Sequence, residues 1–174
     1  MVRVRAEEAR QVAETLKWLL EPACERIEIA GSLRRQWPDV GDIELLVIPR
    51  RQGQVSFLDK AVKRLVFHEV LEYRRNKRGS LMYGPKNKFL LHVASAIAVD
   101  IFCTDAECWP MALAIRTGPK ESNIAVAKAA KRKAWRLKPY GSGFDTPNGP
   151  IRCQSEREVF ELVGLPYLPP EERE

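Results

Sequence analysis

Three carboxylates stand where two β-strands would present them together. Asp42 and Glu44 lie two residues apart in the apolar run DIELLVIP, residues 42–49, and side chains two apart in a strand project from the same face. Asp100 interrupts a second apolar run, AIAVDIFC, residues 96–103. Charges rarely lie in such runs unless they are paired or bind a metal. If the two strands are neighbours, the three carboxylates meet on one side of a sheet.

Such a cluster predicts a site for divalent cations. Repulsion makes adjacent carboxylates costly without a counter-charge, and hard ions such as Mg²⁺ take oxygen ligands. Two ions ~3.5–4 Å apart can clamp the attacking and leaving oxygens of an in-line phosphoryl displacement. Taken singly, each acid also has a structural interpretation. Asp42 could cap a turn, Glu44 could lie on a solvated face and Asp100 could pair with an arginine.

The preceding segment GSLRR, residues 31–35, favours the phosphate chemistry. Gly31 permits close approach of a ligand to the backbone, and Ser32 offers a hydroxyl and an amide at an expected helix start. Arg35 can grip phosphate oxygens with its planar fork. A phosphate-binding segment a few residues before a pair of metal ligands is what nucleotidyl transfer requires.

Composition is that of a folded protein with a basic surface. The chain has 174 residues, 45% hydrophobic and 30% charged, with a net charge of +6 and an isoelectric point near 9.3. The charge favours a polyanionic partner. The N-terminus has no apolar stretch like that of a secretory signal, and no apolar run is long enough for a membrane span. We therefore expect a protein of the cytoplasm, or of the interior of a virus-infected host cell, that is not secreted and has no membrane partner.

The cysteines and histidines do not indicate a zinc site. No Cys-x-x-C pair is present, and neither histidine has a partner at ligand spacing. Reduced, partly buried thiols are therefore the preferred interpretation of the cysteines. These residues are Cys24, Cys103, Cys108, Cys153, His68 and His92.

Hydrophobic periodicity predicts a mixed α+β chain. Helical stripes lie at residues 6–20, 58–66, 119–135 and 155–163, and strand patterns at 26–32, 42–49, 88–93 and 96–104. Residues 137–153 read as strand, loop and strand around Asn148-Gly149. We expect residues 88–93 and 96–104 to be adjacent strands of one sheet. The texture changes to helices after Asp105, so we expect an α/β part, residues 1–105, and a smaller, mostly helical part, residues 106–174.

Two segments concentrate positive charge. Residues 73–88 contain six basic residues and no acid, and residues 120–138 contain seven basic residues and one acid. A solvated helix face usually mixes both signs, so this segregation predicts phosphate contacts. The residues that we expect to bind DNA are Arg74, Arg75, Lys77, Arg78, Lys120, Lys128, Lys131 and Arg132.

The motif GSLRR…VGDIELLV resembles the nucleotidyltransferase signature of the family X DNA polymerases, the DNA polymerase beta group. The likeness extends in order through VDIF and TGPKESN to the C-terminal YGSGFDTPNGPIRCQSEREVFELVGLPYLPPEERE. It therefore covers nearly the whole chain. The resemblance implies an α+β fold, with a nucleotidyltransferase-like palm (a mixed sheet with flanking helices) and a small, mostly helical, thumb-like C-terminal lobe.

The resemblance also implies roles for particular residues. Asp42, Glu44 and Asp100 would hold two Mg²⁺ ions, for which Mn²⁺ can substitute, with Asp100 nearest the primer 3′-hydroxyl. Ser32, Arg35 and the backbone of Gly41 would hold the β- and γ-phosphates of the incoming nucleotide. Asn123 would face its minor-groove edge, and Thr117-Gly118 would form the bend between two helices. The implied nucleotide-binding set is Gly31, Ser32, Arg35, Gly41, Thr117, Gly118, Asn123 and Arg3.

The chain departs from the family pattern at three places. Glu44 replaces the usual aspartate, which keeps the oxygen ligands but adds a methylene. Ile115 and Arg116 replace the aromatic pair that helps exclude ribonucleotides, which leaves sugar discrimination open. The chain begins at the palm, so we expect a minimal palm-plus-thumb form, like the minimal viral members of the family, without a lyase domain.

The leading hypothesis is a monomeric, template-directed DNA polymerase for short-gap filling in DNA repair. It would use dNTPs on gapped or primed DNA and release pyrophosphate. A template-independent or ribonucleotide-incorporating nucleotidyltransferase is the alternative within the enzyme class. A nucleic-acid-binding domain that keeps the fold without activity is a further alternative.

Overall fold

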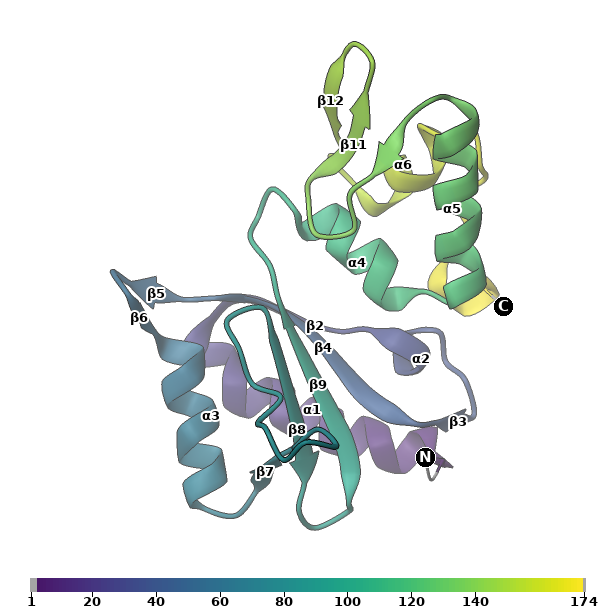
Figure 1. The fold of residues 1–174 in the computed structure, drawn as a ribbon. Helices are drawn as coiled ribbons and strands as arrows, with labels where there is room; N and C mark the ends of the chain where they lie inside the picture. Colours follow the sequence, from purple (N-terminus) through teal and green to yellow (C-terminus); the bar gives the residue numbers. More distant parts are fainter. Residues whose placement is uncertain (1–2, 174) are drawn as a thin grey trace.

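A five-stranded mixed sheet forms the centre of the computed structural model, which describes residues 3–173 (Figure 1). In spatial order its strands are β2 (Cys24–Ile29), β4 (Asp42–Pro49), β9 (Ile97–Cys103), β8 (Asn87–His92) and β7 (Leu71–Tyr73). β4 and β9 pair in parallel, whereas the other neighbours are antiparallel. The predicted adjacency of β8 and β9 is confirmed.

Two helices cover one face of this sheet. They are α1 (Ala6–Leu20), which lies behind the sheet in Figure 1, and α3 (Phe57–Phe67), which is seen at its left. Their apolar stripes pack on alternate, fully buried strand residues such as Ile43, Leu45 and Val99. Because strand side chains alternate between faces, Asp42, Glu44 and Asp100 project from the opposite face.

The C-terminal elements form a second, smaller core. They are α4 (Trp109–Thr117), α5 (Lys120–Arg132), α6 (Glu156–Glu161), the 3₁₀ turn η2 (Pro170–Glu172) and a three-stranded sheet. The strands of that sheet are β10 (Arg136–Leu137), β11 (Gly143–Thr146) and β12 (Gly149–Arg152). Met111, Val126, Phe144 and Val159 are buried between these elements. α4 also packs on the large sheet, since Trp109 and Leu113 join Leu46 and Phe102 in one cluster.

Short elements connect the large sheet to its surroundings. They are the 3₁₀ turn η1 (Glu21–Ala23), α2 (Gly31–Arg34), β1 (Val4–Arg5), β3 (Asp39–Val40), β5 (Arg51–Gln52) and β6 (Val55–Ser56). β1 pairs with β3 and β5 with β6, each as a two-stranded ribbon. In the part of the chain that the structure covers, no helix combines the length and apolarity needed to cross a membrane.

The predicted fold class is confirmed, and one local expectation needs correction. The helix that begins after Pro119 ends at Arg132 and not near Trp135, because Ala134 has a φ of +58° that a continuing helix cannot contain. Ser155 caps α6 by accepting a hydrogen bond from the amide of Glu158, whose carboxylate accepts one from the amide of Gln154. The division at residue 105 stays a prediction.

Candidate active site

The parallel pairing of β4 with β9 brings the three carboxylates to one place. Glu44 lies opposite Asp100 in the register, and Asp42 lies opposite Ala98. All three project from the face that α1 and α3 leave uncovered. The condition on which the predicted cation site depended, that the two acid-bearing strands are neighbours, is therefore met.

The carboxylates lie close enough to perturb one another. Burial, followed by repulsion from Asp42, raises the pKa of Glu44 to about 7. Burial raises the pKa of Asp100 to about 6, although the charge of Arg74 acts in the opposite direction. Burial also raises the pKa of Asp42 above its ordinary value. A bound cation would offset the repulsion between these carboxylates and the cost of burying their charges, so the electrostatics of the site favour cation binding.

Gly31 lies directly against the side chain of Glu44. A Cβ atom built on Gly31 would stand 1.9 Å from Oε2 of Glu44, and the glycine has a φ of +63°. Both conditions require glycine, because another residue would clash and would be strained in this backbone region. The amide of Ala30 also donates a hydrogen bond of 2.8 Å to the carbonyl of Glu44, which joins the end of β2 to β4. Gly31 therefore positions a predicted ligand as well as starting α2.

Arg35 is buried beside the carboxylates, and one of its N–H donors has no hydrogen-bond partner in the described structure. It follows α2, is 8% exposed, stacks on Trp37 at 4.4 Å and donates to the carbonyl of Thr117. Its Nε has no hydrogen-bond partner in the described structure. Buried charged donors without a partner are uncommon in proteins. The geometry thus fits the predicted role of Arg35 as a ligand of phosphate oxygens.

A buried ion cluster beside Arg35 was not predicted from the sequence. Arg34 donates two hydrogen bonds of 2.8 Å to the carboxylate of Glu156 and one to the hydroxyl of Thr117. Arg173 donates to the same carboxylate at 2.9 Å. Burial alone would raise the pKa of Glu156, but these two arginines hold it below its ordinary value. The only signal in the sequence is the first arginine of GSLRR, Arg34.

The remaining predicted nucleotide-binding residues lie around this cluster. The antiparallel pairing of Val4 with Val40 places Arg3 alongside Gly41, at the start of β4. Gly118 has a φ of +64° at the bend between α4 and α5, next to Arg35. Asn123 donates from its amide to the carbonyl of Ile115 at 2.8 Å. Ser32 is half-buried in α2. Their roles stay predictions.

Most of the predicted DNA-binding residues are exposed. They are Arg75, Lys77 and Arg78 between β7 and β8, and Lys120, Lys128, Lys131 and Arg132 on α5. Arg74 differs, because it donates a hydrogen bond of 2.6 Å to Oδ1 of Asp100. An ion pair between Asp100 and an arginine is the structural alternative that the sequence left open for this acid.

The interpretation of residues 73–88 as one phosphate-binding surface is wrong for Lys88. This side chain is 2% exposed and forms an ion pair of 2.7 Å with Asp59 of α3, on the face away from the carboxylates. Its position in β8 forces it inward, since neighbouring strand residues alternate between faces. Lys88 therefore joins a helix to the sheet.

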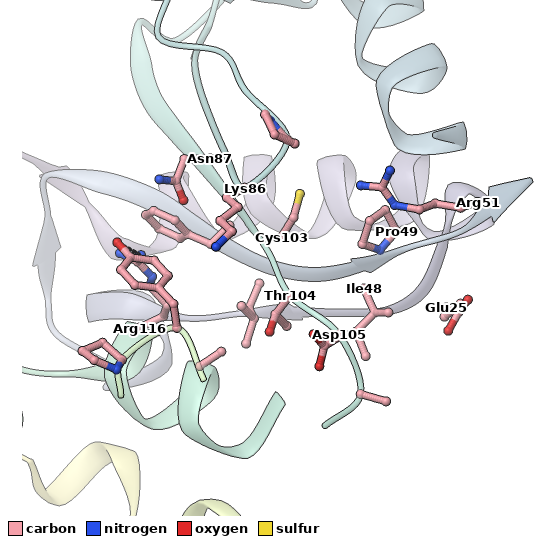
Figure 2. A pocket seen from close by; sticks show the side chains of 17 residues that line it. Glu25, Ile48, Pro49, Arg51, Lys86, Asn87, Cys103, Thr104, Asp105 and Arg116 are labelled. Carbon is pink, nitrogen blue, oxygen red and sulfur yellow. Dashed lines mark hydrogen bonds between the residues drawn. The ribbon is translucent and has the colours of Figure 1, made fainter. Parts of the chain in front are cut away.

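A cleft of about 550 Å³ lies beside the carboxylates, between the large sheet and the C-terminal helices (Figure 2). It is lined by Leu46 and Phe102, which share the strand face of the acids, but not by the acids themselves. Figure 2 shows Arg116 and Lys86 approaching the cleft from opposite walls. Arg116 stacks on Phe102 at 3.6 Å and donates to the hydroxyl of Tyr140 at 3.2 Å. The sequence did not predict this cleft.

The donor set suits a hard divalent cation. Carboxylate oxygens are the ligands that such ions take, and two adjacent strands offer them from three side chains whose pKa values are raised by their surroundings. Between residues 3 and 173, however, no group of three or more acidic, histidine or cysteine side chains is already arranged to hold a metal ion. Asp100 is held by Arg74 instead. The residues fit the ion chemically, and the metal assignment stays a proposal.

Comparison with known proteins identifies the C-terminal part first. Residues 112–174 match the family model described as DNA polymerase beta thumb. The whole-chain fold is similar to two crystal structures of polymerase beta from Leishmania infantum, with TM-scores of 0.76 and 0.79 and identities of 22% and 21%. The match covers 99% of this chain and 77% and 71% of those chains. The fold is therefore that of polymerase beta.

Sequence relatives define the family more closely. A repair DNA polymerase X of African swine fever virus is 26% identical over 98% of this chain and 94% of its own length. The DNA polymerase/3′-5′ exonuclease PolX of Bacillus subtilis is 30% identical over 83% of this chain, which spans 24% of that relative. The chain is thus related to the family X DNA polymerases, as its motifs predicted. These relatives are nucleotidyltransferases, and divalent metals are typical of the family.

Proposed function

We propose that this chain is a DNA-directed DNA polymerase that adds a dNMP to a primer 3′-hydroxyl in short gaps and releases pyrophosphate. The observation that carries the proposal is the parallel register that sets Glu44 opposite Asp100, with Asp42 on the same face. The unpartnered, buried Nε of Arg35 beside them supports a triphosphate as the ligand. The naming of two relatives as polymerases of type X, one of them a repair enzyme, supports the substrate class.

The three carboxylates would hold two Mg²⁺ ions, for which Mn²⁺ can substitute. When bound, such ions supply electrostatic stabilisation of the attacking and leaving oxygens. Asp100 is the carboxylate nearest the primer hydroxyl in this proposal, while Asp42 and Glu44 face the nucleotide. The raised pKa values of Glu44 and Asp100 mean that ionising these carboxyls costs free energy in the metal-free protein. Bound cations would offset that cost.

The protein groups around the acids would bind and orient the nucleotide. Ser32, Arg35 and the Gly41 backbone would hold the β- and γ-phosphates, and Arg3 would approach the same anion from β1. Thr117 and Gly118 would position Asn123 against the base pair. In this arrangement residues 1–105 are the palm and residues 106–174 are the thumb.

DNA is the proposed macromolecular partner. The exposed bases of the β7–β8 connection and of α5 provide cationic surfaces on both parts of the chain, and such surfaces bind phosphates without sequence preference. The two Leishmania structures are described as ternary primer/template and ternary gap complexes, which supports primed or gapped DNA as the substrate of this fold.

Primer extension across a one-nucleotide gap tests the proposal. With Mg²⁺, the wild-type chain should add the dNMP complementary to the template, and Asp100→Ala should lower the rate by ~10³-fold, a loss of several kcal/mol of transition-state stabilisation. Equal extension by both proteins would overturn the assignment of Asp100. Absence of extension, together with salt-sensitive DNA binding and no stabilisation by dNTP, would favour a binding domain without activity.

A second candidate function is ribonucleotide or template-independent addition. The observation in its favour is the position of Arg116, which stands where the family has an aromatic residue and turns toward Phe102 and Tyr140. Comparing kcat/KM for ribo- and deoxynucleotides on gapped and single-stranded primers separates the two functions. Discrimination below about tenfold against the ribonucleotide would favour the second.

A further inference from the structure

Within residues 3–173, Asp100 forms one ion pair, and its partner is Arg74. Arg74 follows β7, and its backbone is fixed by hydrogen bonds with Phe89 and Met82, each of 3.0 Å. From there the guanidinium reaches past β8 to Oδ1 of Asp100 in β9, at 2.6 Å. The two side chains are 28% and 13% exposed. The pair thus combines a fixed backbone with an arginine side chain that solvent still reaches.

This ion pair competes with the proposed metal site. Arg74 occupies a carboxylate oxygen that the proposal gives to a divalent cation, and its charge acts on Asp42 as well as on Asp100. A guanidinium at hydrogen-bond distance repels a second cation and occupies the lone pair that a metal would use. Tight metal binding by Asp100 therefore requires Arg74 to move away.

The surroundings give Arg74 another place and another partner. A cavity of about 300 Å³ borders its side chain, between Gly41 at the start of β4 and Ala98 in β9. Arg75, Lys77 and Arg78 follow it on the exposed connection between β7 and β8. This cationic segment would bring a DNA phosphate within reach of the guanidinium, and phosphate accepts the same forked hydrogen bonds as a carboxylate.

We propose that Arg74 is an exchangeable counter-cation of the metal site, which pairs with Asp100 until a phosphate of bound DNA takes it over and frees Asp100 for a divalent cation. The inference rests on the proposed function and adds a regulation to it. DNA binding raises the affinity for the metal, and by linkage the metal raises the affinity for DNA by the same factor. The acid cluster then binds its ions tightly only when a primer is present.

Titration with Mn²⁺, followed by the electron paramagnetic resonance signal of the free ion, measures this coupling without any turnover. Arg74→Gln should bind Mn²⁺ about tenfold more tightly than the wild type in the absence of DNA, which corresponds to ~1.4 kcal/mol. A primer–template duplex should raise the wild-type affinity by a similar factor and that of Arg74→Gln by less than twofold. A titration of the duplex alone corrects for Mn²⁺ bound to DNA.

Arg75→Gln is the matched control, because Arg75 is adjacent and donates to Gly79 and not to a carboxylate. It should leave the Mn²⁺ affinity of the free protein unchanged. Arg74→Lys keeps the charge and should bind Mn²⁺ less tightly than Arg74→Gln, and melting curves establish that each variant is folded. Equal affinities of Arg74→Gln and wild type, or of the Lys and Gln variants, would overturn the inference. An undiminished effect of DNA in Arg74→Gln would overturn it as well.

The result also separates this inference from the proposed function. If the wild type extends primers and binds Mn²⁺ through Asp100, as a loss of binding in Asp100→Ala would show, a null result for Arg74→Gln overturns the inference alone. If wild type and Asp100→Ala bind Mn²⁺ equally, the metal site itself is wrong and both proposals are overturned.

Discussion

At Gly31 the carboxylate of Glu44 lies directly against the backbone. Substitution with alanine would place a methyl group 1.9 Å from Oε2 of Glu44, at a φ of +63°. We predict that Gly31→Ala lowers the free energy of unfolding by at least ~2 kcal/mol, because overpacking adds to the strain of the left-handed backbone. Denaturant unfolding measures the loss, and primer extension should fall with it because Glu44 must turn away.

Gly53→Ala is the matched control for this prediction. Gly53 also has a positive φ, of +56°, but nothing lies within 4 Å of the position that a Cβ atom would take there. It should cost only the backbone strain, ~1 kcal/mol, and should leave extension unchanged. Equal losses of stability in the two variants would show that the contact with Glu44 is unimportant.

The raised pKa of Glu44 predicts a particular dependence of stability on pH. The folded protein holds this proton up to about pH 7, whereas the unfolded chain releases it near the ordinary value of 4.5. The free energy of unfolding therefore decreases as pH rises through this window. Glu44→Gln removes this contribution, so we predict that the variant is more stable than the wild type by ~2 kcal/mol at pH 8.

Urea unfolding in EDTA at pH 5 and pH 8 checks this expectation. The advantage of Glu44→Gln should be smaller at pH 5, where Glu44 is protonated in the folded protein. Mg²⁺ should stabilise the wild type more at pH 8 than at pH 5, because the metal binds the ionised form. Parallel stability curves for the two proteins would contradict the pKa assignment.

At the scale of elements, the sequence predicted those whose pattern is local. DIELLVIP became β4 over the same eight residues, and the stripe at residues 6–20 became α1. The sequence analysis had to assume that β4 and β9 are neighbours. Alternation of apolar and polar residues shows which face of a strand is buried, but not which strand lies beside it or in what register. The sequence predicts an end of α5 that is too late, since a positive φ at Ala134 has no signature in a run of helix formers.

Lys88 shows how one buried charge joins two elements. It pairs with Asp59, donates to the carbonyl of Gly84 at 2.9 Å and lies over the ring of Tyr83. Tyr83 also donates to Asp59, at 2.6 Å. We predict that Lys88→Met lowers the free energy of unfolding by ~2 kcal/mol, less than for a fully buried pair because Asp59 is 32% exposed.

Thermal unfolding of two further proteins checks the role of this pair. Lys86→Met changes an exposed lysine that lies two residues before Lys88, directly ahead of β8. It should alter stability by less than ~0.5 kcal/mol. Asp59→Asn combined with Lys88→Met should cost less than the sum of the two single changes, since each removes the same interaction. Additive losses would mean that α3 and β8 are joined by packing alone.

For the whole molecule, the structure joins its two parts through Glu156. This carboxylate lies 122 residues from Arg34 in sequence and accepts from it twice. Such a pairing has no local signature, which is why the sequence predicted the carboxylates and Arg35 but not this cluster. Arg34 and Arg35 both bond to Thr117, so the expected phosphate-binding segment is tied to the bend between α4 and α5.

We predict that Glu156→Gln lowers the free energy of unfolding by ~3 kcal/mol, because Arg34 and Arg173 would lose a buried counter-charge. It should also raise KM for dNTP more than it lowers kcat, since Arg35 would lose part of its support. The pKa of Glu156 is held below its ordinary value, so its contribution is complete above about pH 4.5 and is lost as pH falls further. Melting curves and steady-state kinetics check both parts.

Glu161→Gln is the control on the same helix, because within residues 3–173 the Glu161 side chain pairs only with Arg157, at 3.2 Å on the surface. It should change neither stability nor KM measurably. If Glu156→Gln behaves like this control, the ion cluster does not hold the two parts of the chain together.

The most direct test of the central claim, that the acids of β4 and β9 form one nucleotidyl-transfer site, is a single-turnover measurement on a one-nucleotide gap. It follows dNMP addition and pyrophosphate release together in the wild type, Asp42→Asn and Asp100→Asn. We predict one pyrophosphate for each dNMP added by the wild type, and a rate lower by ~10³-fold or more in both variants, whose melting temperatures stay close to that of the wild type. Extension at the wild-type rate by either folded variant would contradict the account.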